Sequence, residues 1–146
     1  MPPTKAGEHF MLFLAWDARG VPDETMFAFA RRLVQAGLSY IVAWGPDCER
    51  VHDIFDDAGI FENLESNSAD AEALIMSTWH EHESLAEALW FALHCAYPAS
   101  PYEATTTSMV LAVIANEEWA GTVESYVADP SRLDAAVDVE EADDGV

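Results

Sequence analysis

Short, continuously apolar segments alternate along this chain with segments of helical periodicity, and this alternation most constrains its fold. Each helical pattern, with apolar residues three and four positions apart, follows one apolar segment. A strand that is apolar along its whole length is typical of a parallel sheet covered by helices on both faces. The apolar segments cover residues 10–16, 39–44, 73–79 and 107–115, and the helical patterns begin after Pro22, near Val51, at Ser84 and near Trp119.

The pattern predicts one three-layer α/β domain over residues 8–133. Its sheet is expected to have four mainly parallel strands, with helices on both faces and the strand order 2-1-3-4 when the strands are numbered along the chain. The alternative is a mixed sheet in which the segment 107–115 runs antiparallel at an edge. Two segments are expected outside regular structure: polar residues 60–70 as a loop, and residues 134–146 as a disordered acidic tail.

Local signals set the expected ends of the helices. Gly37 and Gly59 are placed to end the first two helices. Ser84 and Glu87 match the capping box, in which two side chains satisfy free backbone N–H groups at a helix start. The third helix is therefore predicted from Ser84 to about Tyr97, just before a proline.

The chain is strongly acidic, with 27 Asp and Glu residues against 6 Lys and Arg and a formal net charge of −21. Non-specific binding of nucleic acid requires Lys and Arg to neutralise phosphates, so this class of partner is excluded. The same charge accelerates encounters with basic proteins. Adaptation of a whole proteome to high salt is the alternative origin of the acidity.

Cysteine content and hydropathy predict a cytoplasmic protein that does not enter a membrane. Two cysteines, Cys48 and Cys95, are too few for the disulfide framework of a small secreted domain. Residues 1–8 contain no apolar stretch of signal-peptide type. No apolar run approaches the roughly 20 residues that a membrane span requires.

Four tryptophans follow the predicted strands at their carboxyl ends. Ligands of open α/β sheets bind outside this edge, and aromatic side chains there can stack a ligand or anchor a protein partner. We expect one tryptophan cluster around a crevice, flanked by Glu117 and Glu118, with Trp44 the most buried and Trp119 the most exposed. The alternative is that each tryptophan caps the core separately. The four are Trp16, Trp44, Trp79 and Trp119.

A weaker signal for chemistry comes from His80 and His82, which face the same way in an extended chain and could share a metal ion. Asp17 would join them as a metal ligand or acid/base group if the first strand lies beside the third. The alternative is a solvated turn leading into the third helix. The phosphate-binding and dinucleotide-binding glycine motifs and the nucleophile elbow are absent, so no cofactor is expected.

The third predicted helix is apolar on nearly all sides, and one sheet face cannot cover it entirely. Trp90, His94 and Tyr97 form a second stripe on this helix. Either a neighbouring helix or the following loop covers the stripe, or it is a partner surface, for which a homodimer through residues 84–97 is the prediction.

These observations favour a non-catalytic acidic interaction protein. It would bind and neutralise or regulate a basic protein partner, as immunity and inhibitor proteins do. The alternative is a small-ligand sensor or metal-dependent enzyme that uses the crevice at the carboxyl ends of the strands.

Overall fold

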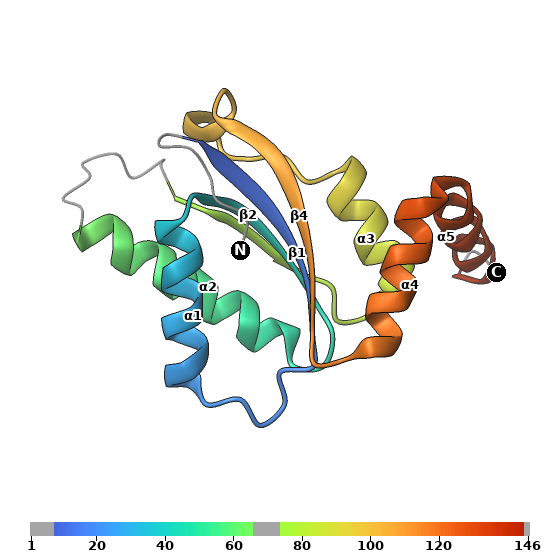
Figure 1. Ribbon diagram of the computed structural model, residues 1–146, viewed down its shortest axis with the longest axis horizontal. Coiled ribbons are helices and arrows are strands. Elements are labelled where there is room, and N and C mark those ends of the chain that lie inside the picture. The colour runs from blue at the N-terminus through green and yellow to red at the C-terminus, as the bar shows by residue number, and fades with distance from the viewer. Residues whose placement is uncertain (1–7, 66–73, 145–146) are drawn as a thin grey trace.

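The computed structural model describes residues 8–65 and 74–144, in which one sheet lies between two layers of helices (Figure 1). The predicted α/β class, the four strands and the helices on both faces are confirmed. The strands are β1 (His9–Trp16), β2 (Leu38–Trp44), β3 (Met76–Trp79) and β4 (Thr106–Ile114). The helices are α1 (Asp23–Gln35), α2 (Cys48–Glu65), α3 (Leu85–His94), the short 3₁₀ helix η1 (Ser100–Tyr102), α4 (Glu117–Ala128) and α5 (Pro130–Asp144).

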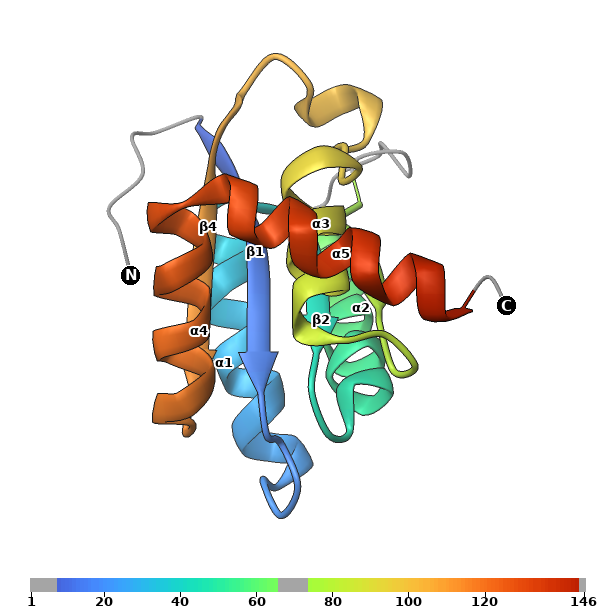
Figure 2. The same ribbon diagram turned by 90° about the vertical axis from the view of Figure 1, so that its right-hand side faces the viewer.

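All four strands are parallel, and their order across the sheet is β3-β2-β1-β4. The pairing of β1 with β2 is the predicted one, but β3 lies beside β2 instead of β1, and β4 takes the place beside β1. The reason is that α1 and α2 cover the same face. Right-handed crossovers on one face move the chain in one direction along the sheet, from β1 through β2 to β3. The helix α3 returns over the other face to β4 (Figure 2).

Side chains of β1 alternate between two cores, one on each face of the sheet. Leu12 and Leu14 point to the core beneath α1 and α2, which also holds Phe55. Phe13 and Ala15 point to the core beneath α3, α4 and α5. Both sets are at most 2% exposed. Burial on both faces explains why this strand is apolar at every position from Phe10 to Trp16.

The start of α3 follows the predicted capping box: Ser84 Oγ accepts a hydrogen bond from Glu87 N, and the Glu87 side chain accepts one from Ser84 N. The prediction for Gly59 is wrong, because α2 continues through it to Glu65. Gly59 is buried, and a Cβ there would lie 3.0 Å from Ile75. The glycine therefore permits close packing and does not end the helix, so residues 60–65 are helical and not part of a loop.

The acidic segment from residue 134 is also not a disordered tail in the part that the structure describes, since α5 extends from Pro130 to Asp144. Leu133 and Val137, one helical turn apart, are only 2% and 6% exposed. They pack with α3 residues in the core on that face. Leu133 and Val137, with Ala136 packed beside them, thus hold this acidic helix on the domain. No helix of the described residues is both long and apolar enough to cross a membrane.

Candidate functional site

A cleft of about 430 Å³ opens at the carboxyl edge of the sheet, on the side covered by α3 and α4. It lies where the loops after β2 and β3 diverge, which is the usual place for a site in an open parallel sheet. Three segments build it: the turn after β2, the turn between β3 and α3, and the first turn of α4. The lining residues are Trp44, Gly45, Pro46, Asp47, His80, Glu81, Glu83 and Trp119.

Two tryptophans form one wall of this cleft. The rings of Trp44 and Trp119 meet edge to face, with centroids 4.9 Å apart and an interplanar angle of 75°. The indole Nε1 of Trp44 donates a hydrogen bond to the carbonyl oxygen of Glu83 at 2.8 Å. Asn116 caps α4 by accepting a hydrogen bond from Trp119 N. Both rings are therefore held in place while remaining only partly buried.

A buried histidine supports the floor of the cleft. His80 is 5% exposed, and its ring lies 4.7 Å from that of Phe91 on α3. Its Nδ1 lies 2.8 Å from Glu83 Oε1, and its Nε2 lies 2.9 Å from Thr78 Oγ1. Both ring nitrogens are thus engaged within the fold. His80 fixes the turn that carries Glu83 instead of offering a free ligand.

The turn after β2 is packed tightly against the end of β1. Gly45 has φ 117° and Asp47 has φ 70°, both in the left-handed region. A Cβ on Gly45 would collide with the carbonyl oxygen of Trp16. The Gly45 position therefore requires glycine, both for its backbone angle and for this close approach.

The electrostatic character of the cleft is negative. Glu81 and Glu83 line it, and the exposed Glu117 and Glu118 stand beside Trp119 at the start of α4. No Lys or Arg of residues 8–65 and 74–144 lines the cleft. The nearby Arg50 is held by Asp47 and Asp23, at 2.8 and 2.7 Å, and by two backbone carbonyls.

The expected single cluster of four tryptophans is wrong. Trp16 lies on the face of α1 and α2, edge to face with Phe29 and 7% exposed, and Trp79 lies against His52 on α2. Alternation of side chains along the strands sends Trp16 and Trp79 to the face of α1 and α2 and Trp44 to the other face, where the first turn of α4 places Trp119. The expected gradient of burial is also wrong, because Trp16 is the most buried and Trp79, 42% exposed, is the most accessible of the four.

The structure does not bring the predicted metal ligands together. Asp17 is paired with Arg19, with two side-chain hydrogen bonds of 2.8 and 2.7 Å, and this partner lowers the pKa of the Asp17 carboxyl. His82 has a 93% exposed side chain, whereas His80 is buried, because the chain turns immediately after β3. Within residues 8–65 and 74–144, no three His, Cys, Asp or Glu residues could hold a metal ion.

The second stripe on α3 is partly covered by α5. Trp90 is half-buried, with its ring 4.7 Å from that of His94, and both line a shallow hollow with Val137 of α5. The alternative of a covering helix thus holds for Trp90. Tyr97, beyond the end of α3, is 65% exposed. A homodimer through residues 84–97 stays a prediction.

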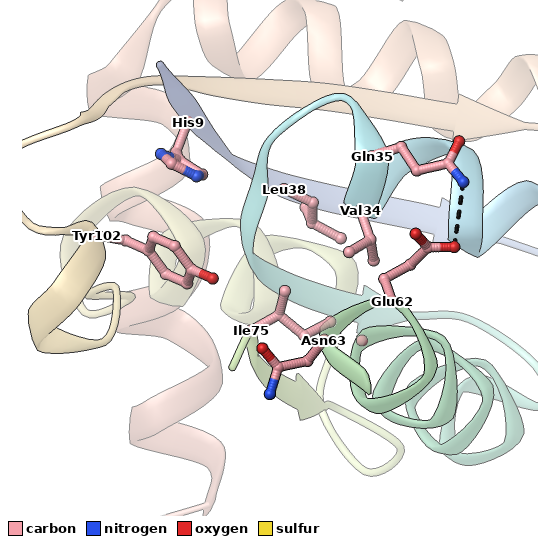
Figure 3. A pocket seen from close by; sticks show the side chains of 9 residues that line it. His9, Val34, Gln35, Leu38, Glu62, Asn63, Ile75 and Tyr102 are labelled. Atoms are coloured by element: carbon pink, nitrogen blue, oxygen red, sulfur yellow. Dashed lines mark hydrogen bonds between the residues drawn. The ribbon is translucent and has the colours of Figure 1, made fainter. Parts of the chain in front are cut away.

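A further cavity, of about 210 Å³, lies at the opposite, amino edge of the sheet (Figure 3). Glu62 accepts hydrogen bonds from Arg31 and Gln35, at 2.6 and 3.1 Å. His9 Nδ1 lies 2.8 Å from Thr105 Oγ1, and burial lowers the pKa of this histidine. These polar groups already form hydrogen bonds within the protein, so the carboxyl-edge cleft is the stronger candidate site. The lining residues are His9, Val34, Gln35, Leu38, Gly59, Glu62, Asn63, Ile75 and Tyr102.

Sequence reasoning placed Trp44, Trp119 and the acidic residues at the correct edge, but it missed Glu83 as the residue that holds both Trp44 and His80. A signal for it was present. Only four residues separate the end of β3 from the capping residue Ser84, so the last of them must lie at the rim of the cleft.

A family model described as a domain of unknown function (DUF7684) matches residues 1–130. No curated protein and no solved structure matches the chain.

Proposed function

Because the chain belongs to the DUF7684 family, whose description leaves the function open, we propose a function on physical grounds: this is a non-catalytic acidic protein that binds a basic protein partner and neutralises or regulates it. The observation that carries the proposal is the carboxyl-edge cleft, in which a fixed tryptophan pair stands beside carboxylates and no Lys or Arg of the described part of the chain lines the wall.

The two kinds of group in the cleft are those that hold a cationic side chain. A Trp face attracts Arg or Lys by about 0.5–2 kcal/mol, depending on how far the pair is desolvated. Carboxylates such as Glu81 accept charge-assisted hydrogen bonds from the same cation. The net charge of −21 would steer the encounter, while the tryptophans supply affinity at short range.

We also place the protein in a reducing compartment, the cytoplasm. Cys48 is buried and Cys95 is exposed, and both are free thiols. Burial raises the pKa of the Cys48 thiol, which keeps it protonated and unreactive. An exposed free thiol such as Cys95 persists most readily where disulfides are not formed.

The test is affinity capture from the native host with a matched pair of tryptophan variants, followed by measurement of Kd with the purified partner. The wild type should retain a protein of high isoelectric point, and less of it at 0.5 M than at 0.15 M salt. Trp119→Ala should weaken the purified complex about 30-fold or more, as expected for loss of a central anchor. Trp79→Ala, which removes an exposed tryptophan on the other face, is the control and should change Kd little.

Two results would count against the proposal. One is that no basic protein is retained at either salt concentration. The other is equal weakening by Trp119→Ala and Trp79→Ala in variants whose thermal unfolding shows them to be folded.

The volume of the cleft favours one alternative, a sensor of a small cationic ligand. About 430 Å³ lies within the usual range of small-molecule sites. Titration with a panel of amines and guanidinium compounds, read by tryptophan fluorescence, separates the two functions. Saturable quenching that Trp119→Phe removes and Trp79→Phe retains would favour the sensor.

A further inference from the structure

The strand β4 forms one edge of the sheet, and it lies in front of β1 in Figure 1. It is nine residues long, and its ladder partner within the described chain is β1. In a parallel pair, alternate residues direct their N–H and C=O groups to the neighbouring strand, and the others direct them outward. A row of backbone donors and acceptors therefore points away from β1 along this edge.

The edge carries few of the features that normally block pairing with another strand. Proteins protect exposed edges with charged residues, prolines, bulges or a covering segment. From Thr106 to Ile114 there is no charged residue and no proline. A register shift at the amino end leaves Thr107 without a counterpart on β1, but from Ser108 to Ile114 the ladder is regular.

The side chains of β4 are incompletely covered on both faces. Val110, Ala112 and Ile114 contact the core beneath α1 and α2, and each is only partly buried. Met109, Leu111 and Val113 do the same on the opposite face. An additional strand beside β4 would complete both cores at once, which a ligand on one face cannot do.

We propose that β4 pairs with β4 of a second copy of this chain, antiparallel about a twofold axis, to give a continuous eight-stranded sheet. A twofold interface brings the same patch of each copy together, so the patch must be self-complementary. Two copies that each carry a charge of −21 repel one another wherever carboxylates meet. The uncharged β4 edge avoids this repulsion, and its apolar residues on each face would meet the same residues of the partner copy.

The test measures the mass of the full-length protein in solution by sedimentation equilibrium from about 1 to 200 μM. The wild type should reach twice the chain mass of 16.1 kDa. Ser108→Glu places a carboxylate at an exposed position of the edge, and Thr25→Glu adds the same charge at an exposed position of α1. Ser108→Glu should weaken dimerisation by about tenfold or more, whereas Thr25→Glu should leave it nearly unchanged.

Hydrogen exchange supplies a second readout that does not depend on a variant. Outward-facing amides of β4 should exchange more slowly at 200 μM than at 1 μM, while amides of the opposite edge strand β3 should not change. A wild type that is monomeric at 200 μM would overturn the proposal. So would a dimer that Ser108→Glu and Thr25→Glu affect equally, or one whose β4 amides show no dependence on concentration.

Discussion

Replacement of Leu133 by alanine tests whether α5 is a packed part of the domain. Leu133 is 2% exposed and lies in the core formed with α3. Truncation of a fully buried leucine to alanine costs about 2–5 kcal/mol, and we expect about 2–4 here because a terminal helix can relax toward the space that is left. With a urea m-value of about 2 kcal/mol/M, the midpoint of unfolding should fall by about 1–2 M.

The measurement is urea unfolding followed by circular dichroism and by tryptophan fluorescence. Val139→Ala is the matched control, because it shortens an aliphatic side chain of the same helix that is 62% exposed. This control should change the free energy of unfolding by no more than about 0.5 kcal/mol. If Leu133→Ala and Val139→Ala gave equal midpoints, the reasoning that α5 is docked through Leu133 would be refuted.

Three further predictions concern single residues. Gly45→Ala should lower the free energy of unfolding by about 2 kcal/mol or more, because the added Cβ would meet a backbone oxygen and the residue has a positive φ. Gly121→Ala should raise the free energy of unfolding by about 0.5–1 kcal/mol, because Gly121 lies within α4 and an added Cβ there would meet no other atom. Thermal unfolding of the two variants checks both expectations. A thiol reagent should label the exposed Cys95 in the native protein and Cys48 only after unfolding, and labelling of both at equal rates would contradict the structure. Burial lowers the pKa of His9 below the ordinary histidine value of about 6.5, so the unfolded chain binds a proton more readily than the folded one. The stability that His9 contributes should be complete above about pH 6.5 and decline as the pH falls below it, and His9→Gln should reduce that decline in unfolding experiments across this range.

The strands were predictable because a strand that is buried on both faces is apolar at consecutive positions, as β1 is from Phe10 to Trp16. The order of the strands was not, since it depends on which face of the sheet each helix covers. Hydrophobic periodicity shows that a helix such as α2 has a buried side, but it does not identify the face of the sheet that this side meets. For this reason the position of β3 in the sheet, and with it the surroundings of His80, was not predicted correctly.

The candidate site was predictable in position and incomplete in composition. Trp44 and Trp119 follow strands, and the carboxyl ends of parallel strands share one edge, so their location followed from the fold class. To predict that Trp16 and Trp79 lie on the other face, each strand would have to be located to the exact residue, because a shift of one residue moves a side chain to the opposite face of the sheet.

The helix α5 was not predicted, because its sequence has almost no amphipathic pattern. Leu133 and Val137 are buried, while the neighbouring Asp134 and Asp138 are exposed. The stabilising surface belongs to α3 and is distant in sequence. Tertiary contacts therefore decide the state of this segment more than its own propensity does.

The central position of β1 in the sheet has a consequence for synthesis on the ribosome. On one side β1 pairs with β2, which follows within a short stretch of chain, but on the other side the hydrogen bond between His9 and Thr105 joins residues 96 positions apart. At about 5–20 residues per second, the nascent chain spends several seconds or more with β1 made and β4 not yet translated. During that interval β1, which is buried along most of its length in the folded domain, presents an open edge, where chaperone binding or misassembly between nascent chains would begin.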